Sequence, residues 1–290
     1  MENKLLSIII VTHNSESIIV SCLENLSGSQ DIEIVVVDCG SSDGTIIKAN
    51  RFNNVKVIQE KNIGYGCGNN SGFSHTSAEN ILILNPDVII SLSQVRRLLD
   101  IFSNSNRESI MSVKMFQQKE GKRIFRRDSR FQERFSYETR LSGALMLMRR
   151  KTFARLGGFD NSIFLYFEEI DLCYRAAAAG IDLKISGEVE VEHLRAGSTP
   201  DNTRYEKLRG WHDGWSKCYL ISKHECRVHK RFFRLFKVVL QTFLKATISL
   251  FLPSSKSRRR EYYKLEGMLS FLRGESSFTE NGVGRFSIDT

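Results

Sequence analysis

The sequence predicts an α/β fold in which helices flank a mostly parallel β-sheet. Short apolar runs that are typical of buried strands occur at residues 5–11, 32–37 and 81–84. Segments whose apolar residues recur at helical spacing lie between them, as at residues 16–26. Because strands that alternate with helices form right-handed βαβ units, the first half of the chain predicts a parallel, Rossmann-like sheet.

Turn signals separate the elements of this first half. Residues 12–15 supply turn and N-cap residues after the first strand. A glycine-rich run at residues 62–70 is expected to be a loop that opens a short helix. In chain order we expect a strand at 5–11, a helix at 16–26, a strand at 32–37, a turn at 39–45 that opens a helix, a strand at 55–59, the glycine loop and a strand at 81–84.

The alternation weakens after about residue 109 and then returns. The intervening residues 122–134 are strongly basic and are expected to form a loop. Acidic residues begin a predicted helix at 168–179, and Gly180 suits its C-cap. The remaining elements expected here are a strand at 141–148 and two short strands at 182–186 and 189–193 that close the domain.

Composition and charge narrow the class of protein. The chain has 290 residues, 41% of them hydrophobic, enough for one large domain or for one domain and an appendage. Its formal net charge of +9 indicates an anionic partner. Nucleic acid is not expected, because no zinc-ligand spacing, recognition helix or aromatic-basic RNA motif occurs. Six cysteines without CxxC spacing, and no pattern typical of a signal peptide or spanning helix, indicate a cytoplasmic protein.

The character of the chain changes near residue 200. We expect an α/β domain over residues 1–200 and a basic helical region over residues 201–290. In the second region, cationic and aromatic residues fall on opposite faces of a predicted helix at about 230–245. Two interpretations stay open: a helix packed on the domain, or one that lies on an anionic membrane surface, which the coincidence of aromatic and basic residues favours.

Carboxylates follow two of the predicted strands. Asp38 ends the second strand, and Asp43 lies in the turn after it. Asp87 follows the strand at 81–84 within Asn85-Pro86-Asp87, where Pro86 must end the strand because it cannot donate a ladder hydrogen bond. The carboxyl ends of strands are where open α/β sheets bind ligands. A turn role remains the alternative for each of these residues, and it is stronger for Asp43 than for Asp38.

Two further sites carry ionisable groups. Glu168, Glu169 and Asp171 follow an aromatic run at residues 164–167. Carboxylates beside apolar groups can acquire the raised pKa that suits proton abstraction, although a solvated first helical turn is the simpler interpretation. Glu168 and Asp171 are expected to share a helix face, whereas Glu169 points elsewhere. His193 ends a short strand and becomes a credible metal ligand if it converges on Asp87.

In this order and spacing, the segments resemble the inverting nucleotide-sugar glycosyltransferases of the GT-A fold, glycosyltransferase family 2, over roughly residues 5–200. The runs at residues 62–72 and 164–175 are most similar to its rhamnosyltransferase-like branch. The resemblance implies a nucleotide-sugar pocket that includes Thr12, Asn14, Asp38, Asp43, Gly64, Asn69 and Asn85. It also implies Mg²⁺ or Mn²⁺ at Asp87, in place of a DxD motif, with His193 as a second contact.

The same resemblance implies a catalytic base. The family's usual pair is Glu-Asp with the Asp as base, so Glu169 inherits that role here, and Glu168 and Asp171 are the other candidates. It implies transfer of L-rhamnose from dTDP-L-rhamnose. Residues 122–134 are a candidate for gripping an acceptor diphosphate, and together with the cationic helix they indicate a lipid-linked saccharide at the inner face of the membrane. A UDP-hexose or UDP-N-acetylhexosamine transferase of the same fold, and a catalytically inactive nucleotide-binding membrane scaffold, are the alternatives.

Overall fold

The computed structural model describes most of the chain, and its residues form two compact units. The expected boundary near residue 200 remains a prediction, but two short earlier segments group with the C-terminal region in the structure. The first unit comprises residues 1–60, 68–159 and 172–198, and the second comprises residues 61–67, 160–171 and 199–290. The described residues are 4–105, 107–119, 121–125, 135–194, 203–249 and 255–286.

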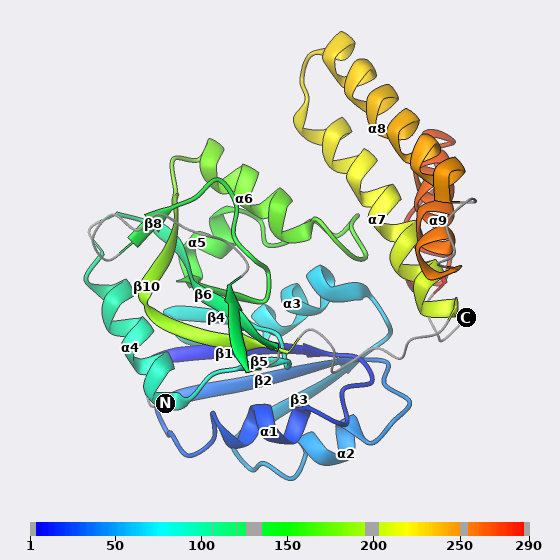
Figure 1. Cartoon of the computed structure of the whole chain (residues 1–290). Coiled ribbons are helices and arrows are strands. Elements are labelled where there is room, and N and C mark those ends of the chain that lie inside the picture. The colour runs from blue at the N-terminus through cyan, green and yellow to red at the C-terminus, as the bar shows by residue number, and fades with distance from the viewer. Residues whose placement is uncertain are drawn as a thin grey trace. The chain divides into compact units, whose positions relative to one another are not determined.

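The first unit is built on one β-sheet (Figure 1), to which ten strands among the described residues contribute. Their order is β3-β2-β1-β4-β9-β6-β10-β5, with β7 on β6 and β8 on β10. The strands are β1 (Leu6–Thr12), β2 (Ile32–Cys39), β3 (Val55–Glu60), β4 (Asn80–Leu84), β5 (Val88–Ile89), β6 (Ser109–Lys119), β7 (Lys122–Phe125), β8 (Phe135–Tyr137), β9 (Leu145–Arg149) and β10 (Asp182–His193).

The sheet confirms the predicted fold class. The strands β3, β2, β1 and β4 run parallel, and β10 runs parallel to β6. The antiparallel strand β9 lies between the two parallel groups. Because the chain order reverses between β1 and β4, the carboxyl ends of these strands mark the topological switch point at which such sheets bind ligands.

Helices cover both faces of this sheet (Figure 1). Alternate side chains of β1 point to opposite faces of the sheet. Ile8 and Ile10 pack on one face, in an apolar core with Ile19 and Leu23 of α1. The helices of the chain are α1 (Ile19–Glu24), α2 (Thr45–Ala49), α3 (Gly64–Ser74), α4 (Leu92–Ser103), α5 (Arg150–Arg155), α6 (Glu168–Ala178), α7 (Thr203–His224), α8 (Val228–Ser249) and α9 (Ser255–Leu272).

The glycine-rich run at 62–70 is not the predicted loop, because α3 begins at Gly64. Its glycines allow this helix to lie close to the sheet. A Cβ at Gly68 would lie 2.9 Å from a methyl carbon of Val11, and one at Gly72 would lie 2.5 Å from a methyl carbon of Ile9. Glycine lowers helix propensity, so a propensity argument favours a loop where packing against the strands requires a helix.

Three further expectations differ from the structure. Residues 109–119, where the alternation weakened, form the long strand β6, and residues 122–125 of the basic segment form β7 rather than a loop. The remaining arginines of that segment, at 126, 127, 130 and 134, lie outside the described residues. The two short strands at 182–186 and 189–193 are one strand, β10, whose pairing with β6 shifts register between Ser186 and Glu190.

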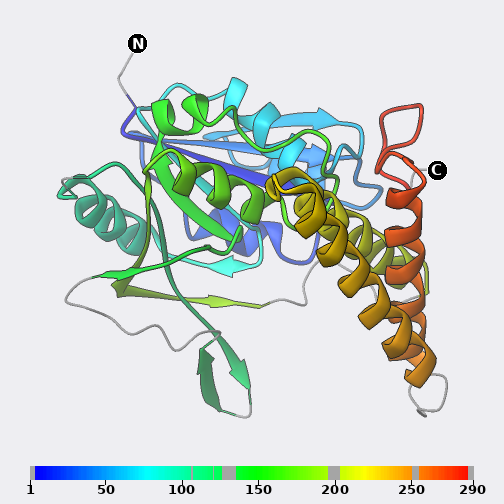
Figure 2. The same cartoon turned by 90° about the horizontal axis from the view of Figure 1, so that it is seen from above.

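The second unit contains the helices α7, α8 and α9, which lie side by side (Figures 1 and 2). Glycines allow α7 and α9 to touch through their backbones: a Cβ at Gly214 would lie 2.0 Å from the carbonyl oxygen of Lys264, and one at Gly267 would lie 1.9 Å from that of Trp211. The Trp211 side chain is fully buried beside this contact. Within the described part of the chain, no helix is both long and apolar enough to cross a membrane.

Candidate active site

The carboxyl ends of β1 and β2 are joined by a polar network. Thr12 ends β1 and donates a hydrogen bond of 3.0 Å from its hydroxyl to Asp38 at the end of β2. The Asp38 side chain is buried and also accepts from the backbone N–H of Ser41, at 2.9 Å, and from its hydroxyl. Asp38 is therefore fixed in orientation before any ligand binds.

Asn14 extends this network across the same edge. Its backbone N–H donates to the Ser41 hydroxyl at 2.8 Å, and its side-chain oxygen accepts from the N–H of Ser42 at 2.8 Å. Asn14 has a φ of +50°, a left-handed conformation that asparagine tolerates well. The structure thus brings Thr12, Asn14 and Asp38 together, as the resemblance implies.

Asp43 has a structural role in the turn after β2. Its carboxylate accepts from the N–H and hydroxyl of Thr45 and from the N–H of Glu16, at 3.0, 2.5 and 3.1 Å. Burial opposes ionisation, but these hydrogen bonds lower the pKa of Asp43. This geometry matches the turn interpretation that the sequence left open, and a ribose contact by Asp43 remains a prediction.

Asp87 and His193 converge. Asp87 directly precedes β5, which pairs antiparallel with the end of β10 so that His193 lies opposite Val88. His193 Nε2 is 3.2 Å from Asp87 Oδ1, and both side chains are about nine-tenths buried. The condition that the sequence set for a metal role of His193 is therefore met by the geometry.

The donor groups at this pair suit a divalent cation. Asn85 Oδ1 and His193 Nδ1 are buried and have no hydrogen-bond partner among the described residues. A carboxylate oxygen, an amide oxygen and an imidazole are ligands that Mn²⁺ accepts, and Mg²⁺ favours the oxygens. In the described ranges no cluster of three or more His, Cys, Asp or Glu side chains could hold a metal. A cation here would thus complete its coordination with phosphate oxygens and water.

Asn69 and Gly64, the other two predicted nucleotide contacts, lie on α3. Asn69 is fully buried in the middle of the helix. Gly64 begins it with a φ of +80°, and a Cβ there would lie 2.1 Å from the carbonyl oxygen of Phe164. This close approach explains the glycine by packing, and a role in binding phosphate remains a prediction.

The segment before the acidic pair is strained. Tyr166 and Phe167 have φ values of +67° and +70°, which large side chains rarely adopt. They directly precede Glu168, the first residue of α6. Two successive residues in this conformation persist only where the surroundings impose it, and such strain is most common at functional sites.

Glu168 and Glu169 differ in environment. The Glu168 side chain is buried, and its Oε2 has no hydrogen-bond partner within the described part of the chain. Burial raises the pKa of Glu168 well above its usual value, and the charge of Glu169 raises it further. Glu169 is only partly buried. Glu168 and Asp171 share the buried face of α6, as the spacing predicts.

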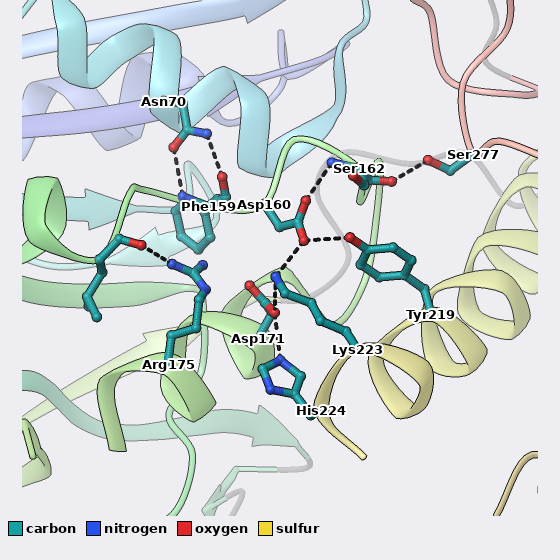
Figure 3. Close-up of polar contacts among 11 residues, drawn as sticks. Asn70, Phe159, Asp160, Ser162, Asp171, Arg175, Tyr219, Lys223, His224 and Ser277 are labelled. Atoms are coloured by element: carbon teal, nitrogen blue, oxygen red, sulfur yellow. Dashed lines mark hydrogen bonds and ion pairs between the residues drawn. The ribbon is translucent and has the colours of Figure 1, made fainter. Parts of the chain in front are cut away.

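Asp171 is held by the end of α7 (Figure 3). Its Oδ1 lies 2.6 Å from the ammonium of Lys223 and 2.7 Å from Nε2 of His224. The same ammonium lies 2.6 Å from Asp160, which also accepts from the Tyr219 hydroxyl at 2.8 Å. Burial opposes ionisation of Asp160, but these donors lower its pKa to about 2. Asp171 is therefore a structural anchor, which weakens it as a candidate base.

Sequence reasoning did not find the partners of these acids. Lys223 is 63 residues from Asp160, and no periodic pattern links them. His13, whose Nδ1 lies 2.7 Å from the Cys39 carbonyl oxygen, and Ser41 were also missed. Their position just after the first two strands was a usable signal, because that edge is where ligands bind.

We expect Glu168→Gln to make the protein more stable at neutral pH. Above about pH 4 an unfolded glutamate ionises while folded Glu168 keeps its proton, so stability falls with rising pH up to the raised pKa and then levels off. Glutamine removes this loss, about 1.4 kcal/mol for each unit of pKa shift. Urea unfolding between pH 4 and 8 measures the slope, with the exposed Glu24→Gln as control. An unchanged slope would show that Glu168 ionises normally.

These features define a class of protein: an α/β protein with a polar network at the carboxyl edge of a parallel sheet, an acid paired with an imidazole beside it, and two adjacent glutamates at the start of a helix. The chain matches glycosyl transferase family 2 over residues 7–172. It belongs to this family, and its fold is the GT-A fold.

Individual relatives agree with this assignment. The chain is 30% identical over 222 residues to the low-salt glycan biosynthesis hexosyltransferase Agl10 of Haloferax volcanii, covering 69% of this chain and 70% of the relative. It is 25% identical over 243 residues to the N-acetylglucosaminyl-diphospho-decaprenol L-rhamnosyltransferase of Mycobacterium tuberculosis, covering 66% and 79%. The fold resembles that of the mannosyltransferase PcManGT from Pyrobaculum calidifontis in complex with GDP-Man and Mn²⁺, with a TM-score of 0.58, 13% identity and coverage of 94% and 88%.

Proposed function

We propose that the protein is a metal-dependent inverting glycosyltransferase that moves L-rhamnose from dTDP-L-rhamnose to a lipid-linked saccharide in cell-surface polysaccharide synthesis. The observation that carries this proposal is the convergence of Asp87 and His193 at 3.2 Å beside the switch point of the sheet. The rhamnosyltransferase from Mycobacterium tuberculosis supports the choice of donor sugar and of a lipid-diphosphate acceptor.

We assign binding of the nucleotide-sugar donor to residues of the first unit. Asp38, held by Thr12 and Ser41, accepts hydrogen bonds from the pyrimidine base, and Asn14 and Asn69 contact the ribose and the diphosphate. Asp87 and His193, with Asn85 beside them, would hold Mg²⁺ or Mn²⁺. When bound, the cation supplies positive charge that stabilises the departing diphosphate.

We assign removal of the proton from the acceptor hydroxyl to residues of the second unit. Glu169 takes the proton from the acceptor hydroxyl, whose oxygen attacks the anomeric carbon from the face opposite the nucleotide and so inverts the configuration. Burial raises the pKa of Glu168 and so favours its neutral form, which would keep a second negative charge away from the base. The anchors at Asp160 and Asp171 fix the ends of the segment that carries both residues.

The helix α8 is proposed to place the enzyme on the inner face of the membrane. Seven large apolar side chains on it are between 42% and 66% exposed, which is unusual for a solvated helix. Basic residues that include Lys230, Arg234 and Lys237 accompany them and favour an anionic lipid surface. We name these seven residues the apolar face of α8: Phe232, Phe233, Phe236, Leu240, Phe243, Leu244 and Ile248.

We expect Phe236→Glu together with Phe243→Glu to weaken binding to phosphatidylglycerol vesicles at least tenfold. Burial of one such side chain contributes about 1.5–3 kcal/mol, and the new carboxylates are repelled by anionic lipid. Vesicle co-sedimentation measures the binding. Ile47→Glu, at an apolar residue of α2 that is 69% exposed, is the matched control. Equal binding of the double variant and this control would make α8 a packing element only.

A panel of nucleotide sugars tests the proposed function. The expected result is turnover of dTDP-L-rhamnose with a polyprenyl-diphosphate saccharide, lost on chelation. Turnover of a UDP-hexose or UDP-N-acetylhexosamine instead would keep the fold and change the sugar. Nucleotide binding without turnover of any donor would favour the inactive membrane scaffold.

A further inference from the structure

A cationic stripe runs along the second unit between the strained segment and α9. Arg209, Asp213 and Lys217 lie four residues apart on α7 and therefore share one face. On one side of this face, Ser216 donates a hydrogen bond of 2.8 Å to the Leu165 carbonyl oxygen. On the other side, Gly210 lies against the backbone of α9. The stripe thus borders both the segment before Glu168 and the helix α9.

The helices α8 and α9 add positive charge to the stripe. Lys264 of α9 pairs with Asp213 at 2.6 Å, and Arg260 lies one turn before it. Lys245 of α8 and Lys264 are both close enough to Lys217 to repel its charge. We name the five basic residues the α7–α9 cation cluster: Arg209, Lys217, Lys245, Arg260 and Lys264.

Several cations of the cluster have no carboxylate partner. Asp213, which lies on the same face of α7, is paired with Lys264. Lys217 is half-buried and makes no ion pair or hydrogen bond with any described residue. Burial and the two neighbouring lysines lower the pKa of Lys217. Arg209 and Arg260 also lack an ion-pair partner in the described ranges. Clustered cations of this kind are stabilised when an anion binds them.

Tyr166 places this cluster next to the acidic pair. Leu165, just before it, accepts the hydrogen bond from Ser216 of α7, which holds this segment against the helix that carries Arg209. Burial raises the pKa of Tyr166, and the charges of Arg209 and Arg260 lower it. Tyr166 has a left-handed backbone conformation and lies two residues before Glu168. An anion on the cluster would therefore lie beside the segment that carries the proposed base.

We propose that the α7–α9 cation cluster binds the diphosphate group of the acceptor lipid and so positions the acceptor sugar for deprotonation. The inference rests on the proposed function, because it assigns a site to that reaction's acceptor. A diphosphate suits the cluster better than a single phosphate, since it presents two to three negative charges to cations that come from α7, α8 and α9. The exposed apolar face of α8 belongs to the same unit and suits the lipid chain.

Binding of farnesyl diphosphate to the full chain, by titration calorimetry, tests this proposal. Lys217→Gln with Arg209→Gln is expected to weaken binding at least about tenfold, because charge-assisted hydrogen bonds are lost. Removal of unpaired cations should leave the fold intact, which a thermal melt checks. Lys151→Gln, at an exposed lysine of α5, is the matched control. Binding of dTDP should be equal in all three proteins.

Two outcomes would overturn the proposal. One is farnesyl diphosphate affinity that is unchanged in the double variant or reduced equally in the control. The other is a loss of binding to phosphatidylglycerol vesicles that matches the loss for farnesyl diphosphate, which would identify a lipid-headgroup surface instead. These experiments measure binding and not sugar transfer. Failure of sugar transfer with every donor would refute the proposed function, and it would be distinguishable from both of these outcomes.

Discussion

Glu169→Gln is expected to lower the rate of sugar transfer by about 10²–10⁴-fold while dTDP binding is unchanged. Glutamine keeps the shape of the side chain but cannot accept the proton of the acceptor hydroxyl. Steady-state kinetics with saturating donor measure the effect, which should lie in kcat rather than KM.

Glu168→Gln is the matched control, because it alters the neighbouring carboxyl by the same atoms. We expect it to retain most activity, since burial raises the pKa of Glu168 and so favours its neutral form, which glutamine imitates. If instead Glu168→Gln is inactive and Glu169→Gln is active, Glu168 is the base and its raised pKa is the property that suits it to that task.

Asp87→Ala is expected to abolish detectable transfer and to weaken Mn²⁺-dependent dTDP binding by at least about 100-fold, more than the loss typical of an outer-shell residue. Asp87 is the carboxylate of the pair, so alanine removes the negative charge that would hold the cation. The backbone of Asp87 accepts a hydrogen bond from Leu194 at 2.9 Å, and this contact survives the substitution.

Asp87→Asn separates charge from shape. It should behave like alanine in Mn²⁺-dependent dTDP binding while melting at the temperature of the unaltered protein. Transfer that continues in the presence of a chelator, with Asp87→Ala still inactive, would remove the metal from the proposal and leave Asp87 as a direct contact to the sugar nucleotide.

Local pattern was sufficient for the parallel half of the fold. The strands β1 and β4 are buried over their whole length and β2 at every residue except Glu33, so their apolar composition predicts them. Pattern failed where tertiary contact overrides local preference. The glycines of α3 are typical of a loop in isolation, and they form a helix because Ile9 and Val11 leave no room for a side chain. The strand β10 continues past Gly187 because β6 pairs with both of its halves.

For the candidate site too, local sequence predicted some residues, and others depend on tertiary contacts. Asp38 and Asp87 could be found because Asp38 lies at the end of β2 and Asp87 lies three residues after β4, and strand ends meet at one edge of a parallel sheet. The sequence could not predict that Asp87 lies beside His193, because this contact depends on the pairing of β5 with β10. The anchoring of Asp160 and Asp171 by Lys223 depends on contacts between residues more than fifty positions apart, which leave no mark in local sequence.

The backbone contact between α7 and α9 has a consequence for engineering. Gly214 and Gly267 admit no side chain, so neither helix can be exchanged for that of a relative without the other. Residues 160–171 must move with them, because α7 holds this segment through Ser216, Tyr219 and Lys223. A chimaera that takes these helices from a relative therefore requires a transplant of at least two segments, residues 160–171 and the helices α7 to α9. Exchange of only the chain after residue 200 would separate residues 160–171 from the helix α7 that contacts them.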